Sequence, residues 1–215
     1  MTFDRSVKYY PVVKKLNTTR QRLLETAVEL IWENSYGSVG VEDICKRAKV
    51  QKGSFYHFFP SKADLAVAAF DCHWDQIQPA KDKHFAADIA PLDRIAGFCD
   101  FIYQAQTQKK KEAGKVLGCL FTSTGSELST QDRKIRLKIK EMSARNCGLL
   151  EKAIRDAQKL GQIPLFDPIE KAQELYAFLM GVFVQAKIED DAELFRRLKP
   201  AFFRLLDVKE VSVKR

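Results

Sequence analysis

The sequence predicts an all-α fold in which a small N-terminal helix-turn-helix domain is joined by a long fourth helix to a larger helical domain. Apolar residues recur at helical spacing along nearly the whole chain of 215 residues, and strict strand-like alternation hardly occurs. Two short helical stretches near the N-terminus are separated by only two or three residues, which is the spacing of a helix-turn-helix. Apolar residues make up 46% of the chain and charged residues 30%, as in ordinary globular proteins.

The first three helices follow a basic N-terminal arm over residues 1–17. Thr18 or Thr19 can cap a first helix, which the stretch Tyr36-Gly37-Ser38 ends. A short second helix is predicted over Val41–Ala48, and a third from Gln51 to about Phe58. We therefore expect a helix-turn-helix domain over residues 18–62.

The fourth helix has the clearest start signal in the chain. Ser61 can be its N-cap and Asp64 occupies the third helical position, as in a capping box. Pro60 and Leu65 stand at the positions of a hydrophobic staple. A long helix should follow, to about Gln78.

Longer helices should fill the second domain, residues 63–215. They are predicted over Pro91–Gln106, about Gly118–Leu128, Asp132–Leu160, Pro168–Lys187 and Asp191–Leu206. Gly161 and Pro168 fit the preference for glycine after a helix and proline at its start. Pro200 should kink or split the last helix. The basic stretch from Lys109 to Lys115 is expected to be an exposed loop or a fraying helix end.

The residue inventory argues against an enzyme, a metal site and a cofactor. The five cysteines are widely spaced with no CxxC pair, which indicates buried thiols. The three histidines form no metal-binding spacing, and no glycine-rich phosphate loop or GxSxG motif occurs. The longest apolar run, over residues 175–184, is shorter than the roughly 20 residues of a membrane span, and the start does not resemble a signal peptide. We expect a cytoplasmic protein without membrane contact.

Positive charge is concentrated in the N-terminal part. The net charge is +8, and residues 1–62 hold 11 Lys and Arg against 6 Asp and Glu. A basic excess confined to one segment is typical of a phosphate-binding surface, although many solvated helices are basic too.

The stretch KGSFYHFFPSKADL, from Lys52 to Leu65, resembles the DNA-binding signature of TetR-family repressors. The positions in register with that signature are Gly53, Phe55, Tyr56, Phe58, Phe59, Ser61, Lys62 and Leu65. Two positions depart from the pattern. Gly40 stands where Ser or Thr normally caps the second helix, which puts a phosphate contact in doubt, and Lys49 stands where the turn usually carries Gly.

The resemblance implies a dimeric transcription repressor that binds double-stranded DNA. Lys52 and Ser54 lie at the start of the third helix, the end that enters the major groove in this motif. Tyr56 and His57 can donate to phosphates, as can Lys62 beside the free N–H groups of the fourth helix. The candidate DNA-binding residues are Thr19, Lys46, Gln51, Lys52, Ser54, Tyr56, His57 and Lys62. We expect the aromatic residues Phe55, Phe58 and Phe59 to be core residues.

The second domain is expected to bind a small, largely apolar effector and to form a homodimer. The resemblance implies that its last two long helices pair with their mates in a four-helix bundle, although their apolar stripes could equally be intrachain core. The candidate effector-binding residues are Trp74, Phe98, Tyr103, Phe121, Asn146 and Tyr176. Asn146 interrupts an apolar stripe, so it either bonds a neighbouring backbone group or faces a cavity.

The sequence thus predicts a ligand-responsive repressor that binds a palindromic operator as a dimer. The alternative is a DNA-binding regulator that senses redox state or electrophiles through a thiol, which requires a cysteine of lowered pKa and some exposure. A DNA-binding protein without a ligand also fits the sequence.

Overall fold

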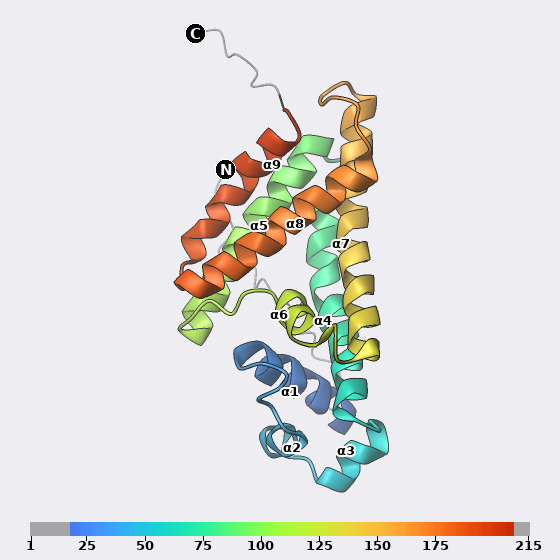
Figure 1. Cartoon of the computed structure of the whole chain (residues 1–215), viewed down its shortest axis with the longest axis vertical. Coiled ribbons are helices and arrows are strands. Elements are labelled where there is room, and N and C mark those ends of the chain that lie inside the picture. The colour runs from blue at the N-terminus through green and yellow to red at the C-terminus, as the bar shows by residue number, and fades with distance from the viewer. Residues whose placement is uncertain (1–17, 209–215) are drawn as a thin grey trace. The chain divides into compact units, whose positions relative to one another are not determined.

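The protein is built from helices joined by short turns (Figure 1). The computed structural model describes residues 18–208, and within that range no strand occurs, so the all-α prediction is confirmed. The predicted basic arm, residues 1–17, lies outside the described residues.

The described chain packs into two compact units. The first contains the residues up to Ala80 together with Leu120–Lys140, and the second contains Lys81–Cys119 together with the residues from Glu141 onward. Two helices are continuous from one unit into the other: α4 (Lys62–His84) and α7 (Arg133–Lys159).

The first unit holds three short N-terminal helices: α1 (Thr19–Glu33), α2 (Val41–Ala48) and α3 (Lys52–Phe58). Thr18 caps α1, because its hydroxyl accepts a hydrogen bond from the Gln21 N–H at 3.2 Å. Sequence analysis placed these three helices within a residue or two of their observed bounds.

The two ends of α2 depart from the signature without losing the fold, while the start of α4 follows it. Gly40 caps α2 with an extended backbone, and its own N–H donates to the Asp43 carboxylate at 2.8 Å. Lys49 ends α2 in the left-handed region, with φ of 55°, which a non-glycine residue can adopt at modest cost. Ser61 accepts from the Asp64 N–H at 3.1 Å, as the capping prediction requires.

Two of the three phenylalanines of the motif are buried in the core of the first unit. Phe55 is fully buried and Phe59 nearly so, whereas Phe58 is 37% exposed. The prediction that Phe58 is a core residue was therefore wrong. The chain becomes extended at Phe59, directly after α3 ends, and this turns the Phe59 ring inward in place of Phe58.

The second unit contains α5 (Pro91–Ala113), α8 (Pro168–Glu189), the 3₁₀ helix η1 (Ala192–Arg197) and α9 (Leu198–Leu205). The 3₁₀ helix and α9 pack against both α5 and α8. The predicted split of the last helix is confirmed, but it falls between Arg197 and Leu198. Pro200 lies in the first turn of α9, where a missing N–H leaves no hydrogen bond unmade.

Two predicted helix ends were too early. Helix α5 runs past Gln106 to Ala113, where Gly114 ends it with φ of 72°, because the lysines of this stretch are good helix formers. Helix α4 runs past Gln78 to His84 and contains Pro79. The remaining helix, α6 (Leu120–Leu128), begins two residues later than predicted.

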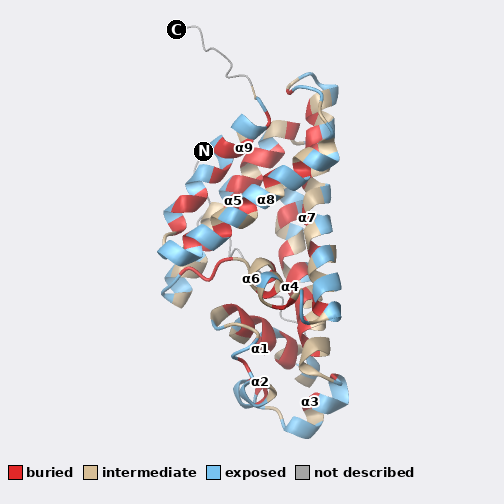
Figure 2. Ribbon diagram, viewed as in Figure 1, coloured by how far each residue is buried: buried red, intermediate tan, exposed pale blue. Residues whose placement is uncertain are grey.

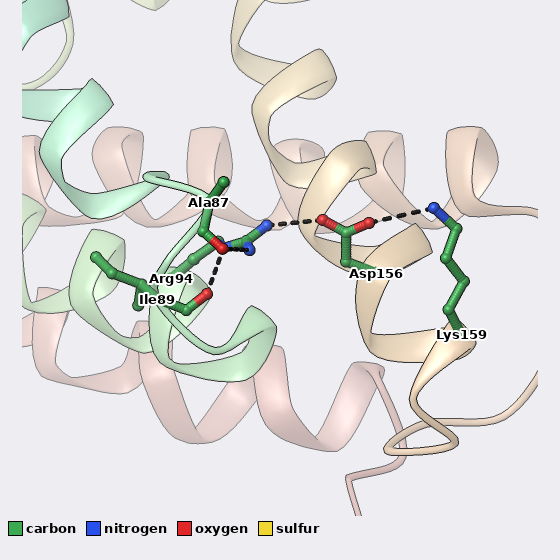
Figure 3. A network of polar contacts seen from close by, with 5 residues as sticks. All are labelled: Ala87, Ile89, Arg94, Asp156 and Lys159. Carbon is green, nitrogen blue, oxygen red and sulfur yellow. Dashed lines mark hydrogen bonds and ion pairs between the residues drawn. The ribbon is translucent and has the colours of Figure 1, made fainter.

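A buried arginine fixes the connection between α4 and α5 to α7 (Figure 3). Arg94 is 5% exposed and donates to the carbonyls of Ile89 at 2.7 Å and Ala87 at 2.9 Å. It also forms an ion pair with Asp156 at 2.8 Å, and Asp156 in turn lies 3.4 Å from Lys159. The charge is thus hydrogen-bonded as well as paired, which burial of an arginine requires.

Candidate functional site

The outward surface of α3 carries most of the predicted DNA-binding residues. Phe55 is fully buried, while Lys52, Tyr56 and His57 are exposed. Figure 2 shows pale blue, exposed residues along α3. Gln51, which caps the helix, is exposed, and Ser54 is half-buried. The structure therefore gathers five predicted side chains on one short helix.

Lys52 is held by an acidic residue that sequence analysis did not single out. Its ammonium lies 2.8 Å from the Glu42 carboxylate in the first turn of α2, and both side chains are exposed. The hydrogen bond between them raises the pKa of Lys52 and lowers that of Glu42. Lys52 must leave Glu42 before it can bind a base or a phosphate.

Gly53 is surrounded by open space. A Cβ added to it would meet no atom within 4 Å, and its φ is not in the left-handed region. Nothing within the described chain thus requires glycine here. Gly53 is the second residue of α3, and glycine within a helix costs up to about 1 kcal/mol relative to alanine, so an external reason for it is expected. Close approach of the helix backbone to DNA is such a reason.

Lys62 makes contacts within the first unit. Its ammonium donates to the carbonyls of Tyr36 and Val39, each at 2.9 Å, and lies 3.9 Å from the centroid of the Tyr36 ring. Burial lowers the pKa of Lys62. This lysine fastens the α1–α2 connection to the start of α4, while its contact with a phosphate stays a prediction.

Helix α6 also binds the α1–α2 connection. The Glu127 carboxylate accepts from the N–H of Tyr36 at 3.2 Å and of Gly37 at 2.6 Å. Burial and the nearby carboxylates of Asp132, Glu127 and Asp64 raise the pKa of Tyr36 to about 12. Helix α6 is therefore part of the first unit, although it follows α5 in the chain.

The predicted DNA-binding residues Lys46 and Thr19 lie on α2 and α1 of the first unit. Lys46 is exposed near the end of α2, and Thr19 is half-buried at the start of α1. Arg47 and Lys49, which the predictions omitted, are exposed beside Lys46.

Trp74 and Phe121, two predicted effector-binding residues, are buried in the first unit. Phe121 packs on Phe70 with ring centroids 5.8 Å apart and on His73 at 5.7 Å. His73 also packs edge-on against Trp32 of α1 at 5.1 Å. These ring contacts hold α1, α4 and α6 together within the first unit.

Asn146 and Tyr176 meet in a polar cluster of the second unit, together with Lys81; Asn146 and Lys81 are buried and Tyr176 is half-buried. Lys81 is 6% exposed, and its ammonium donates to the Asn146 side-chain oxygen at 2.7 Å. The Asn146 amide donates to the Met142 carbonyl at 2.9 Å, which confirms the predicted bond to a neighbouring backbone group. Asn146 and Ser143 also form hydrogen bonds with Tyr176.

Burial dominates the electrostatics of this cluster. It lowers the pKa of Lys81 to about 8, opposed by the nearby Cys119 and Asp82, and it raises the pKa of Tyr176. Sequence analysis missed Lys81, although Trp74, Ile77, Lys81 and Phe85 share one helical stripe whose other members are apolar.

Phe98 and Tyr103 make their contacts outside this cluster. Phe98 is buried against Phe85, with ring centroids 5.3 Å apart. Tyr103 donates to Glu193 at 2.8 Å, and the Arg196 guanidinium lies 4.6 Å from its ring centroid. The structure thus brings together only two of the six predicted effector-binding residues in one polar cluster.

Neither a metal nor a membrane site is found in the part of the chain that the structure describes. Residues 18–208 contain no group of three or more His, Cys, Asp or Glu side chains that could hold a metal ion. Over the same range, no helix combines the length and the apolar character needed to cross a bilayer.

Three short helices that bury Phe55 and present lysine, serine, tyrosine and histidine on α3 define a helix-turn-helix DNA-binding protein. Residues 23–69 match the family described as "Bacterial regulatory proteins, tetR family", and residues 91–202 match "Tetracyclin repressor-like, C-terminal domain". The two segments together cover more than half of the chain. The protein belongs to the tetR family.

Relatives of known name are transcription regulators. The transcriptional regulator AcuR of Cereibacter sphaeroides is 30% identical over 178 residues, which cover 79% of this chain and 76% of AcuR. The HTH-type transcriptional repressor NemR of Escherichia coli strain K12 is 28% identical over 177 residues, which cover 81% of this chain and 87% of NemR.

Solved structures of transcription regulators have the same fold. The reduced form of E. coli NemR superposes with a TM-score of 0.75 at 25% identity, covering 90% of this chain and all of that one. The regulatory protein TetR from Rhodobacter sphaeroides gives a TM-score of 0.76 at 27% identity, covering 87% of this chain and 98% of that one. The helix order beyond the DNA-binding head is therefore also that of the family.

Proposed function

We propose that the protein is a homodimeric transcriptional repressor that binds a palindromic operator and is released by a small effector. The observation that carries this proposal is the surface of α3, which is polar and basic on the outside and anchored by Phe55 inside. One helix of seven residues contacts too few bases for specific binding, so two copies related by a two-fold axis are needed.

An exposed apolar face on α8 supports the dimer. Val184 is 47% and Ile188 76% exposed on the side of α8 away from its buried stripe, and Phe178, 37% exposed, lies at the edge of this face with its ring against Phe202. Gly181 lies between them, and a Cβ added to it would meet no atom within 4 Å. A row of this kind is typical of a face that packs against a second helix. We propose the α8 of a second copy as its partner.

Three helices could carry a structural change from a bound effector to the DNA-binding head, the name we give to the first unit. Helices α4 and α7 run continuously from the second unit into the first, where Lys134 and Lys138 of α7 pair with Asp64 and Asp71 of α4. Helix α6 begins directly after Cys119, and near its other end Glu127 accepts hydrogen bonds from the α1–α2 connection. A displacement of these helices would change the positions of the two α3 helices in the dimer, so the heads would no longer match the operator.

Selection of DNA fragments by the purified protein tests the proposal. The selected fragments should contain inverted repeats whose half-site centres lie about 34 Å, or a multiple of that, apart. Recovery of only asymmetric or sequence-indifferent DNA would contradict it. A selected operator then allows effector screening by release of DNA.

A thiol sensor is the second candidate function. Burial raises the pKa of Cys99 to about 12 and raises the pKa values of Cys45 and Cys147, which disfavours the reactive thiolate at these three positions. Cys72 and Cys119 remain, and both are partly exposed. If alkylation of Cys72 or Cys119 releases the operator and Ala variants of both abolish that release, the thiol mechanism is supported over a non-covalent effector.

A further inference from the structure

Lys81 is a buried amine held in one place by a polar network. Its hydrogen bond to Asn146 is short, and Asn146 is itself fixed by the Met142 carbonyl and by Tyr176. The amine comes from α4, the amide from α7 and the phenol from α8, so three helices of the second unit converge here. The residues one turn away on the same helices, Ile77 and Phe85 on α4 and Met142 and Leu150 on α7, are buried and apolar. The site is a small polar spot in an apolar interior.

Burying a lysine ammonium costs several kcal/mol, which the protein lowers by favouring the neutral amine. A neutral, desolvated lysine amine is the nucleophile that forms Schiff bases with carbonyl compounds. The titratable groups around it are Asp82 on α4 and Cys119 before α6, with Tyr176 on α8 and Cys147 on α7 further along the network. Two of these neighbours are thiols, and Tyr176, with its pKa raised, keeps its proton.

We infer that the Lys81 cluster is an effector site for a small aldehyde or ketone, which condenses reversibly with the Lys81 amine. The nitrogen lone pair attacks the carbonyl carbon and forms the C–N bond, while the carbonyl oxygen takes up a proton. The resulting carbinolamine then loses its hydroxyl group with a second proton as water, leaving a C=N bond. Both hydrogens of that water balance the two that the amine gives up, and no oxidant or reductant is needed.

The position of the site explains how imine formation at Lys81 would change the position of the DNA-binding head. This step rests on the proposed function. Lys81 is the first residue of α4 in the second unit, and Asn146 lies on α7, the other helix that continues into the first unit. Imine formation removes the donor that binds Asn146 and adds the carbon chain of the effector between α4 and α7. Both helices must then shift.

Butanal with sodium borohydride, applied to the full-length protein, tests the site directly. Borohydride reduces the imine to a stable secondary amine that peptide mass mapping locates, and it leaves no trapped adduct on thiols. At pH 7.5 an amine with a pKa near 8 is neutral about 200-fold more often than one at the usual value near 10.4. At long reaction times Lys81 should therefore be labelled at far lower butanal concentrations than the exposed Lys83 of the same helix.

Two variants and one ligand complete the test. Lys81→Arg keeps a cation but cannot form an imine, and Lys83→Met is the matched control, so the first should abolish the high-affinity label and the second should leave it. Labelling of Lys81 no better than Lys83 would overturn the inference. Butanoate that stabilises the protein against heat while butanal gives no Lys81 label would also overturn it, in favour of a carboxylate ligand.

Operator binding separates this inference from the proposed function. Wild-type protein labelled at Lys81 should lose operator affinity roughly 5- to 150-fold, the usual range of allosteric coupling, whereas Lys81→Arg treated in the same way should not. Untreated wild-type protein that binds no selected operator would contradict the repressor function but not the labelling result. Selective labelling without any loss of operator affinity would overturn the role of Lys81 as an effector site.

Discussion

Nothing in the described structure requires glycine at position 53, so we expect DNA binding to explain why glycine is there. Alanine fits without a clash and favours the helix, so Gly53→Ala should leave thermal stability unchanged or raise it by up to about 1 kcal/mol. If the backbone of α3 approaches DNA closely, the added methyl group should weaken operator binding by tenfold or more. Circular dichroism melting and operator titration on the same sample measure both effects. Unchanged operator affinity would show that the DNA backbone stays away from Gly53.

Lys62 contacts two carbonyls of its own chain, so its first role is within the head. Lys62→Met should destabilise the protein by about 1 to 3 kcal/mol, since two carbonyls lose a charged donor and the Tyr36 ring loses a cation. The salt dependence of operator binding distinguishes this role from a phosphate contact. A variant of unchanged stability whose salt slope falls by about one would assign the lysine to DNA instead.

Lys81 gives stability an unusual dependence on pH. Its pKa is about 8 in the folded protein and near 10.5 in the unfolded chain, so between these values the unfolded state binds the extra proton. Stability therefore rises with pH across this window, and at pH 7 the buried cation costs up to about 3 kcal/mol. Lys81→Met, which has no charge to bury, should be more stable than wild type at pH 7.

The advantage of Lys81→Met should shrink as the pH rises from 8 to 10, because wild-type protein then buries a neutral amine. Urea unfolding of both proteins at four pH values measures the difference. Lys83→Met is the control, as its side chain is exposed on the same helix. A constant difference across the window would mean that Lys81 does not titrate in the folded state.

At the scale of elements, α6 binds the α1–α2 connection through one carboxylate. Glu127→Gln leaves a single neutral oxygen where two oxygens accept from Tyr36 and Gly37, and it should cost about 1 kcal/mol of stability. The response of the head to an effector should fall as well, because α6 then moves without moving the connection. Glu29→Gln removes the same charge from an exposed position of α1 and should change neither.

Melting temperature and effector-induced operator release measure the effect of Glu127→Gln. A variant that loses stability but keeps full release would place the transmission in α4 or α7 alone. A variant indistinguishable from Glu29→Gln would show that the two hydrogen bonds contribute nothing in solution.

Local signals in the sequence were sufficient for the helices of the head. The caps at Thr18 and Ser61, the apolar spacing of α1 and α2, and the motif from Lys52 to Leu65 are all short-range features, and the structure has them as predicted. Phe58 was misplaced because a seven-residue helix offers too few positions to decide which of two adjacent phenylalanines turns inward. Two helices were underestimated in length: α4 continues through Pro79 to His84, and α5 continues past Gln106 because the lysines there are good helix formers.

The polar contacts between distant segments could not be read from the sequence. Glu127 meets Tyr36 across 91 residues, and Lys81 meets Asn146 across 65, so no periodicity connects them. Asn146 was noticed because it interrupts an apolar stripe, and Lys81 interrupts another in the same way. Two polar residues inside apolar stripes are therefore worth considering as a pair.

At the scale of the whole molecule, operator binding should depend on the formation of a dimer through α8. Replacing both Val184 and Ile188 with Glu places four carboxylates in the proposed two-fold interface, where each apolar side chain would otherwise contribute about 1.5 to 3 kcal/mol on burial. The dimer dissociation constant should rise at least 100-fold, which corresponds to about 2.8 kcal/mol. The monomer should keep its helical content, since both side chains are exposed in the single chain.

Leu165→Glu, at the most exposed leucine outside α8, is the control for added charge and should stay dimeric. Sedimentation equilibrium measures the dissociation constant, and operator titration at several protein concentrations should show that the double variant binds only as its dimer reforms. A double variant that remains dimeric, or one that binds the operator tightly as a monomer, would move the interface away from this face of α8.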